Sequence, residues 1–142
     1  SGEVARDSSG QGGDCEIRGA KWVDGKTGKQ LEFNGDDNYL QARRPEIGNI
    51  SGAFSISFWM NPAAWDSQYS AGVLGKRLTD SDRGYVIYAD GTIPTKMNLR
   101  AVGTLGGYGM LPSASDVDED VWQHWTVTYD PGARILLRPD EA

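Results

Sequence analysis

Polar and apolar residues alternate most clearly over residues 53–61. Apolar side chains occupy every second position, at Phe54, Ile56, Phe58 and Met60, and mostly polar residues lie between them. A repeat of two residues is typical of a β-strand that turns one face to a core and the other to water. The segment therefore predicts a strand with one buried face.

The same alternation recurs over residues 121–129, where Trp125, Val127 and Tyr129 alternate with polar residues that include His124. We expect at least one of the tryptophans in these two strands to be a core residue. No window of eleven or more residues shows helical periodicity, and turn-forming sequences separate the other apolar segments. Further strands are predicted at Gln30–Phe33, Tyr39–Ala42, Gly72–Arg77, Gly84–Ala89 and Met97–Val102.

Length and composition fit one domain. The chain has 142 residues, enough for a substantial core. Residues 1–14 are rich in glycine, serine and aspartate, which predicts a flexible or loop-like arm before a β-domain over residues 15–142. The single cysteine, Cys15, cannot form an intrachain disulfide.

The charge of the chain argues against two classes of partner. Its formal net charge is −6, which disfavours nucleic acid and anionic membrane surfaces. No apolar run approaches the ~18 residues of a membrane-spanning helix, so membrane insertion is not expected.

Several segments, taken in order, resemble the laminin-G-like domain of the concanavalin A-like superfamily. The most recognisable are Gln30–Leu40, Gly52–Met60 and Trp122–Asp130. The resemblance implies an all-β fold, a two-sheet antiparallel β-sandwich of the jelly-roll kind. It also implies a module of secreted or cell-surface proteins, with a glycan or an extracellular protein as its partner.

The resemblance further implies closing strands beyond the one that ends at Asp130, yet the sequence ends at Ala142. We therefore expect a domain shortened at its C-terminus. An uncovered edge strand can pair with another chain. Because the segment Ile135–Leu137 is apolar, we expect it to pair with a strand of a second copy, which gives a homodimer, or with a strand of another protein.

One turn could hold calcium, because it gathers the oxygen-bearing residues Asn34, Asp36, Asp37 and Asn38. Calcium takes six to eight oxygen ligands, so main-chain carbonyls or water would have to complete the shell. The resemblance also implies calcium near this turn. The alternative is that these residues simply form a tight turn, for which Asn and Asp are well suited.

Sugar binding has candidate residues in the loops. Exposed aromatic rings stack on the apolar faces of sugars, and Trp65, Tyr69 and Tyr108 lie in polar or glycine-rich segments, with Arg83 as a partner for hydroxyl groups. The alternative for each ring is local packing over the edge of the sandwich.

The sequence holds no clear set of catalytic residues, so we predict a non-catalytic protein. Glycoside hydrolases use two carboxylates that flank one bond. Asp116, Asp118 and Asp120 have alternate spacing, but Pro112 and residues 113–115 predict a loop there. Three functions follow, in order of preference: a carbohydrate-binding or adhesion module, a structural or protein-interaction domain that pairs through an open sheet edge, and a glycoside hydrolase-related domain.

Overall fold

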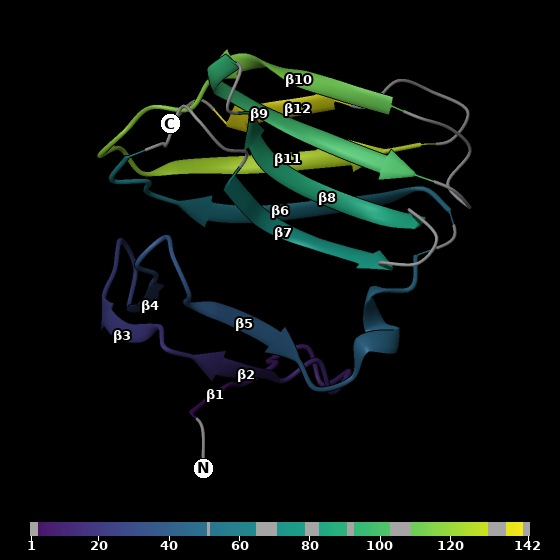
Figure 1. Cartoon of the computed structure of the whole chain (residues 1–142). Helices are drawn as coiled ribbons and strands as arrows, with labels where there is room; N and C mark the ends of the chain where they lie inside the picture. Colours follow the sequence, from purple (N-terminus) through teal and green to yellow (C-terminus); the bar gives the residue numbers. More distant parts are fainter. Residues whose placement is uncertain are drawn as a thin grey trace. The chain divides into compact units, whose positions relative to one another are not determined.

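Strands make up almost all of the regular structure (Figure 1). The one helical element among the described residues is a 3-10 helix, Pro45–Gly48, and no helix found there is long and apolar enough to cross a membrane. Residue contacts divide the chain into two units, Ser1–Gly48 and Asn49–Ala142. The computed structural model describes residues 3–50, 52–64, 71–78, 83–90, 93–102, 109–130 and 136–140.

The first unit, Ser1–Gly48, holds two small antiparallel sheets. The three-stranded sheet has the order β1-β2-β5, and β3 and β4 form a separate pair. Their bounds are β1 Val4–Ala5, β2 Cys15–Arg18, β3 Lys21–Asp24, β4 Lys29–Glu32 and β5 Tyr39–Ala42.

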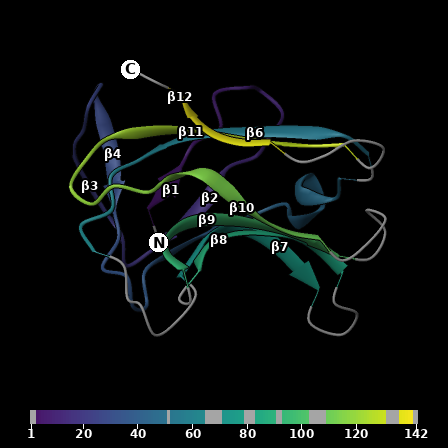
Figure 2. The same ribbon diagram turned by 90° about the horizontal axis from the view of Figure 1, so that it is seen from above.

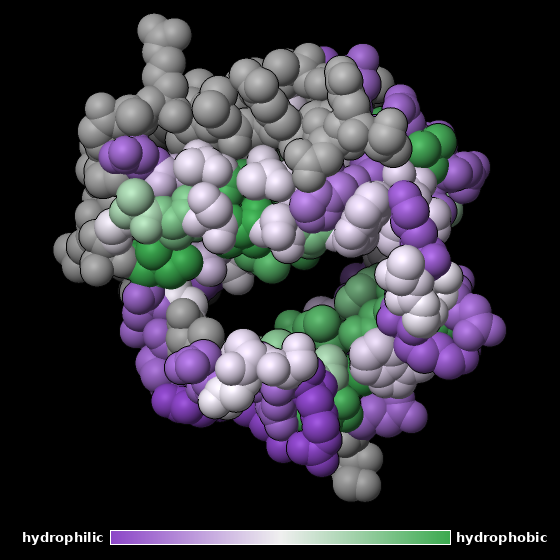
Figure 3. Space-filling view, turned by 180° about the vertical axis from the view of Figure 1, so that it is seen from behind, coloured by the Kyte–Doolittle hydropathy of each residue, from purple (hydrophilic) through white to green (hydrophobic). Residues whose placement is uncertain are grey.

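One face of the β1-β2-β5 sheet is apolar. Ile17 pairs with Leu40 and Cys15 with Ala42, and because paired residues point to the same side, all four share a face. Ile17 is buried, whereas Leu40 is 40% exposed. In Figure 3 the residues of this unit separate in the same way, with green hydrophobic residues gathered on one side and purple polar residues over the rest.

The second unit, Asn49–Ala142, consists of two larger antiparallel sheets. They have the orders β12-β11-β6 and β10-β9-β8-β7, and they form two facing layers (Figure 2). Together they give the predicted β-sandwich. Their bounds are β6 Phe54–Met60, β7 Ala71–Leu78, β8 Arg83–Asp90, β9 Ile93–Val102, β10 Gly109–Asp116, β11 Gln123–Tyr129 and β12 Leu136–Asp140.

The core of this unit lies between the two sheets. Trp125 and Val127 of β11 are fully buried, as are Ile87 of β8 and Met97 of β9. Every second residue of β6 packs against this cluster, so β6 has one face on the core, as its alternating sequence predicted. The expectation that an in-strand tryptophan belongs to the core is confirmed by Trp125.

The predicted loop is wrong for Pro112 and residues 113–116, because β10 runs from Gly109 to Asp116. Asp118 and Asp120 follow the strand and lie outside regular structure, as predicted. β10 lies at the edge of its sheet, and its register with β9 shifts between Pro112 and Asp116. Proline is tolerated at edges and bulges because no ladder hydrogen bond is needed there. The buried Ser113 hydroxyl instead accepts a hydrogen bond from the backbone N–H of Met97, at 3.1 Å.

Both ends of the chain contribute strands. Within the predicted arm, Val4 and Ala5 pair with β2, and the domain boundary at residue 14 stays a prediction. Near the C-terminal end, β12 pairs with β11 and forms one edge of its sheet. An edge strand is therefore present in the segment where we expected one, and the homodimer stays a prediction.

The buried position of Ile87 predicts a large loss of stability on truncation. Ile87→Ala should lower the free energy of unfolding by about 2–5 kcal/mol, because a cavity remains in the core. Leu74 pairs with Ile87 from β7 but is 39% exposed, so Leu74→Ala should cost clearly less. Urea unfolding of the two variants measures the difference, and equal losses would contradict this description of the core.

Candidate functional site

The outward face of β6 and β11 carries hydroxyl groups in a regular array. The register of the two strands places Ser55 opposite Thr128 and Ser57 opposite Thr126. The inward residues of both strands are in the core, so alternation sends these four side chains to the other face. The hydroxyls of Ser55 and Thr128 share a hydrogen bond of 3.0 Å.

An aromatic pair ends this array. Trp59 lies opposite His124 in the same register, and the two ring centroids are 5.0 Å apart with an interplanar angle of 38°. Trp59 is 49% exposed. His124 is partly buried in β11.

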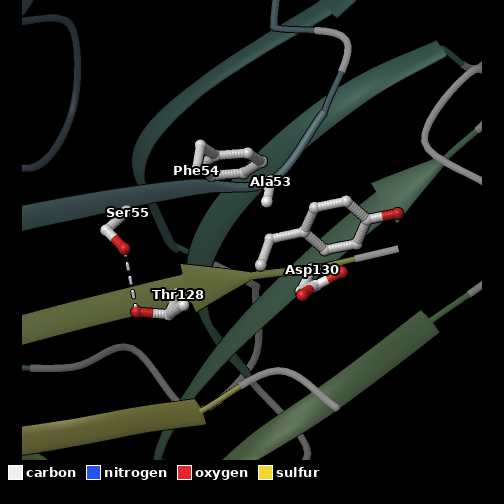
Figure 4. A pocket seen from close by; sticks show the side chains of 6 residues that line it. Ala53, Phe54, Ser55, Thr128 and Asp130 are labelled. Carbon is white, nitrogen blue, oxygen red and sulfur yellow. Dashed lines mark hydrogen bonds between the residues drawn. The ribbon is translucent and has the colours of Figure 1, made fainter. Parts of the chain in front are cut away.

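A pocket of about 360 Å³ lies at the opposite end of these two strands (Figure 4). It is widely open to solvent. Its lining combines apolar surface with hydroxyl and carboxylate oxygens, and comes from Ala53, Phe54, Ser55, Thr128, Tyr129 and Asp130. Ser55 and Thr128 thus belong both to the pocket and to the hydroxyl array.

Aromatic packing fixes the pocket wall. The ring of Phe54 lies 5.4 Å from that of Tyr129 and 5.2 Å from that of Tyr85, in tilted arrangements. Burial raises the pKa of Tyr129 because it disfavours the phenolate, and the nearby Asp130 carboxylate raises this pKa further. The phenol of Tyr129 is therefore neutral at physiological pH.

The loop residues predicted to bind sugar are not placed by the structure. Trp65, Tyr69 and Tyr108 lie outside the described residues. Arg83 begins β8, where its backbone pairs with Leu78, but its side chain is not among those described. All four stay predictions.

The predicted calcium turn is held by its own hydrogen bonds. The Oδ1 atom of Asn34 accepts the backbone N–H groups of Asp36, Asp37 and Asn38, at 3.0, 3.3 and 3.2 Å. The Oδ1 atom of Asn38 accepts the N–H of Asn34 at 3.1 Å. The side-chain amides of both asparagines donate to Asp37 Oδ1, at 2.7 and 3.1 Å. These hydrogen bonds show that the four residues form a tight turn, which is the alternative given above. Calcium binding stays a prediction, with the Asp36 and Asp37 carboxylates as its candidate ligands.

The acidic residues at the end of β10 and directly after it organise a loop. Asp116 forms an ion pair with Lys96 at 2.7 Å. The Gln123 side chain accepts the N–H of Asp118 at 3.0 Å and donates to an Asp118 carboxylate oxygen at 3.3 Å. Within the described residues, no cluster of three or more His, Cys, Asp or Glu side chains suits a metal ion.

A second carboxylate organises the loop between β1 and β2. Asp7 accepts hydrogen bonds from the backbone N–H of Ser9, the hydroxyl of Ser9 and the N–H of Gly13, each at 2.8 Å. These bonds, the Ser9 hydroxyl first, lower the pKa of Asp7 from 3.8 to about 2. Burial raises the pKa of the neighbouring Cys15 thiol, with smaller contributions from the Asp14 and Asp7 charges. That thiol is therefore protonated and weakly nucleophilic at neutral pH.

Fold and pocket together define a class, an antiparallel β-sandwich module with an open pocket at its strand ends. A family model of the laminin-G type, described as the concanavalin A-like lectin/glucanases superfamily, matches residues 34–137. The chain belongs to this superfamily, and the resemblance found in the sequence is confirmed.

A solved structure has the same fold. The binding domain of Paraclostridial Mosquitocidal Protein 1 superposes with a TM-score of 0.73 at 18% sequence identity. The match covers 97% of this chain and 37% of that one, so this chain spans well under half the length of its structural neighbour. No curated protein matches the sequence. At this sequence identity the likeness shows the fold alone.

The hydrogen bonds of Asp7 predict a pH-dependent stability. A carboxyl whose pKa is lowered by folding stabilises the folded state above its unfolded pKa, and this contribution disappears as the pH falls through the folded value. Stability should therefore fall between about pH 4 and pH 2, and Asp7→Asn should flatten that part of the profile.

The test is thermal unfolding across this range, with NMR titration of the Asp7 carboxyl. Ser9→Ala removes the strongest hydrogen bond and should move the pKa of Asp7 back toward 3.8. An Asp7 carboxyl that already titrates near 3.8 in the unmodified chain would contradict this description of the loop.

Proposed function

We propose that this chain is a carbohydrate-binding module of a secreted or cell-surface protein. The observation that carries the proposal is the pocket at the ends of β6 and β11, where the residues of the lining include the hydroxyls of Ser55 and Thr128 and the carboxylate of Asp130. Membership of the concanavalin A-like lectin/glucanases superfamily supports it.

The chemistry of the pocket suits a sugar. A pyranose presents apolar C–H groups on its ring faces and hydroxyl groups around its edge. The methyl group of Ala53 offers a small apolar surface for the first, and the hydroxyls of Ser55 and Thr128 can exchange hydrogen bonds with the second. The rings of Phe54 and Tyr129 point to the core side of the sheet and support this end of the pocket from behind. Asp130 adds a carboxylate, which accepts stronger hydrogen bonds than a neutral oxygen does.

The size and openness of the pocket set the expected affinity. A volume of about 360 Å³ lies at the lower end of the range for small-molecule sites. An open pocket leaves part of its ligand in water, so little apolar area is removed from solvent. We therefore expect a single sugar to bind with a dissociation constant on the order of 1 mM.

Binding without catalysis is part of the proposal. Of the described residues that line the pocket, Asp130 alone carries a carboxylate, and glycoside hydrolysis ordinarily uses two. Of the three alternately spaced aspartates considered above, Asp116 contacts Lys96 and Asp118 contacts Gln123.

A second candidate function, pairing with another chain, is favoured by one observation. β12 lies at the edge of the β12-β11-β6 sheet, and the backbone groups on its far side could form a ladder with a further strand. Light scattering at rising protein concentration tests it. A defined dimer would support this function, whereas a monomer throughout would count against it.

A glycan panel titrated with the whole chain tests the main proposal. We expect millimolar binding of at least one monosaccharide, and Asp130→Asn should weaken it several-fold because the charged acceptor becomes neutral. Glu119→Gln is the matched control, because it also removes one negative charge but lies in an exposed turn. It should bind as the unmodified chain does.

The same titrations, run in calcium and in excess chelator, decide the calcium proposal. Tighter binding or a higher melting temperature in calcium, lost in Asp37→Asn, would support a site at residues 34–38. Identical curves would leave that segment as a turn. No binding to any sugar in either condition would overturn the proposed function itself.

A further inference from the structure

The hydroxyl array on β6 and β11 leads away from the pocket. Ser55 and Thr128 line the pocket, and the next outward pair is Ser57 and Thr126. Trp59 and His124 follow on the same face. Trp59 lies four positions after Ser55, so this face extends about 13 Å at ~3.3 Å per residue.

Trp59 is unusual among the large side chains of β6. Its neighbours at the inward positions pack against the core, whereas Trp59 is 49% exposed on the outer face. A tryptophan that becomes buried removes roughly 150–250 Å² of surface from water, so leaving it exposed forgoes much of that stabilisation. His124 contacts one part of the ring and helps to fix its orientation, because the ring centroids are 5.0 Å apart.

The surroundings of Trp59 distinguish a sugar from a protein partner. Protein interfaces need about 800 Å² on each side, with a contiguous apolar centre. Among the described outward residues of β6 and β11, Trp59 is the one large apolar side chain, and four of the others carry hydroxyls. One flat ring beside neutral hydrogen-bonding groups matches a sugar ring and its edge.

The charge of the face indicates the class of glycan. Within the described residues, its outward positions on β6 and β11 hold no Asp, Glu, Lys or Arg. On the neighbouring β12, the register places Arg138 opposite Thr126 and Asp140 opposite His124, so one positive and one negative residue share this face and their charges offset one another. A sulfated or carboxylated glycan would find no cationic partner on β6 and β11 and would meet an Asp beside the Arg of β12, whereas a neutral glycan needs no cationic partner.

We propose that the outer face of β6 and β11 is an extended subsite for a neutral linear glycan, with Trp59 as its stacking platform. The glycan lies along the two strands, with one sugar in the pocket and another on Trp59. Hydroxyls of Ser57 and Thr126 contact the sugars between them. This inference rests on the proposed function and deepens it, because it requires an oligosaccharide rather than a single sugar.

Calorimetric titration of the whole chain with neutral oligosaccharides tests the proposal. Cello-, malto- and manno-oligosaccharides, each from monosaccharide to hexasaccharide, are the probes. We expect affinity for one series to rise with length, and Trp59→Ala to weaken hexasaccharide binding about tenfold, the size of one lost stacking contact. Binding of the monosaccharide at the pocket should change less than twofold.

Two further variants separate stacking from folding. Trp59→Phe keeps an aromatic ring and should retain most of the affinity for the hexasaccharide. Trp22→Ala removes a tryptophan that is 44% exposed on β3 and should bind as the unmodified chain does. Melting temperatures of all variants show whether each one is folded.

The outcomes distinguish this inference from the function on which it rests. An unmodified chain that binds no saccharide would overturn both. Two results would overturn the extended subsite and leave the pocket. One is a chain that binds the monosaccharide but binds the longer oligosaccharides of the series no more tightly. The other is a folded Trp59→Ala variant with unchanged affinity for the hexasaccharide. Tighter binding of sulfated than of neutral oligosaccharides at physiological salt would overturn the assignment to neutral glycans.

Discussion

The pairing of β6 with β11 is the constraint on which the second unit depends. Seven consecutive residues of each strand face one another, from Gln123 opposite Met60 to Tyr129 opposite Phe54. One set of alternate side chains, with Trp125 and Val127 at its centre, fills the space between the sheets. The other set must then face outward, because neighbouring residues of a strand point to opposite sides. A slip of one residue would exchange the two sets, so core burial also fixes which residues a ligand can reach.

Much of this fold could be predicted from the sequence, because its longest strands alternate clearly. Residues 53–61 and 121–129 gave β6 and β11 to within two residues at either end. β10 was missed because its proline and serines resemble a loop, and propensity carries no information about an edge position or a register shift. The buried Ser113 shows the reason in detail. Its hydroxyl accepts a backbone N–H from β9, a long-range contact that local sequence does not reveal.

The candidate site was harder to predict than the fold. From the sequence we expected sugar-binding rings in the loops, because loops carry function in many folds. The alternation nevertheless contained a signal for Trp59, which falls in register with Ser55 and Ser57 rather than with the core residues of β6. The partner residues could not be inferred in the same way. His124 and Thr126 are far away in the chain and reach the face only through strand pairing, and the pocket arises where the ends of two strands meet.

The most direct measurement of the central claim is an NMR titration of the isotope-labelled chain with the oligosaccharide that binds most tightly. We expect the indole N–H of Trp59 and the ring signals of His124 to shift first. The backbone amides of Ser57 and Thr126 should shift with them, while the indole signals of Trp22 and the buried Trp125 stay in place. Shifts confined to other parts of the chain, with Trp59 and His124 unchanged, would contradict it.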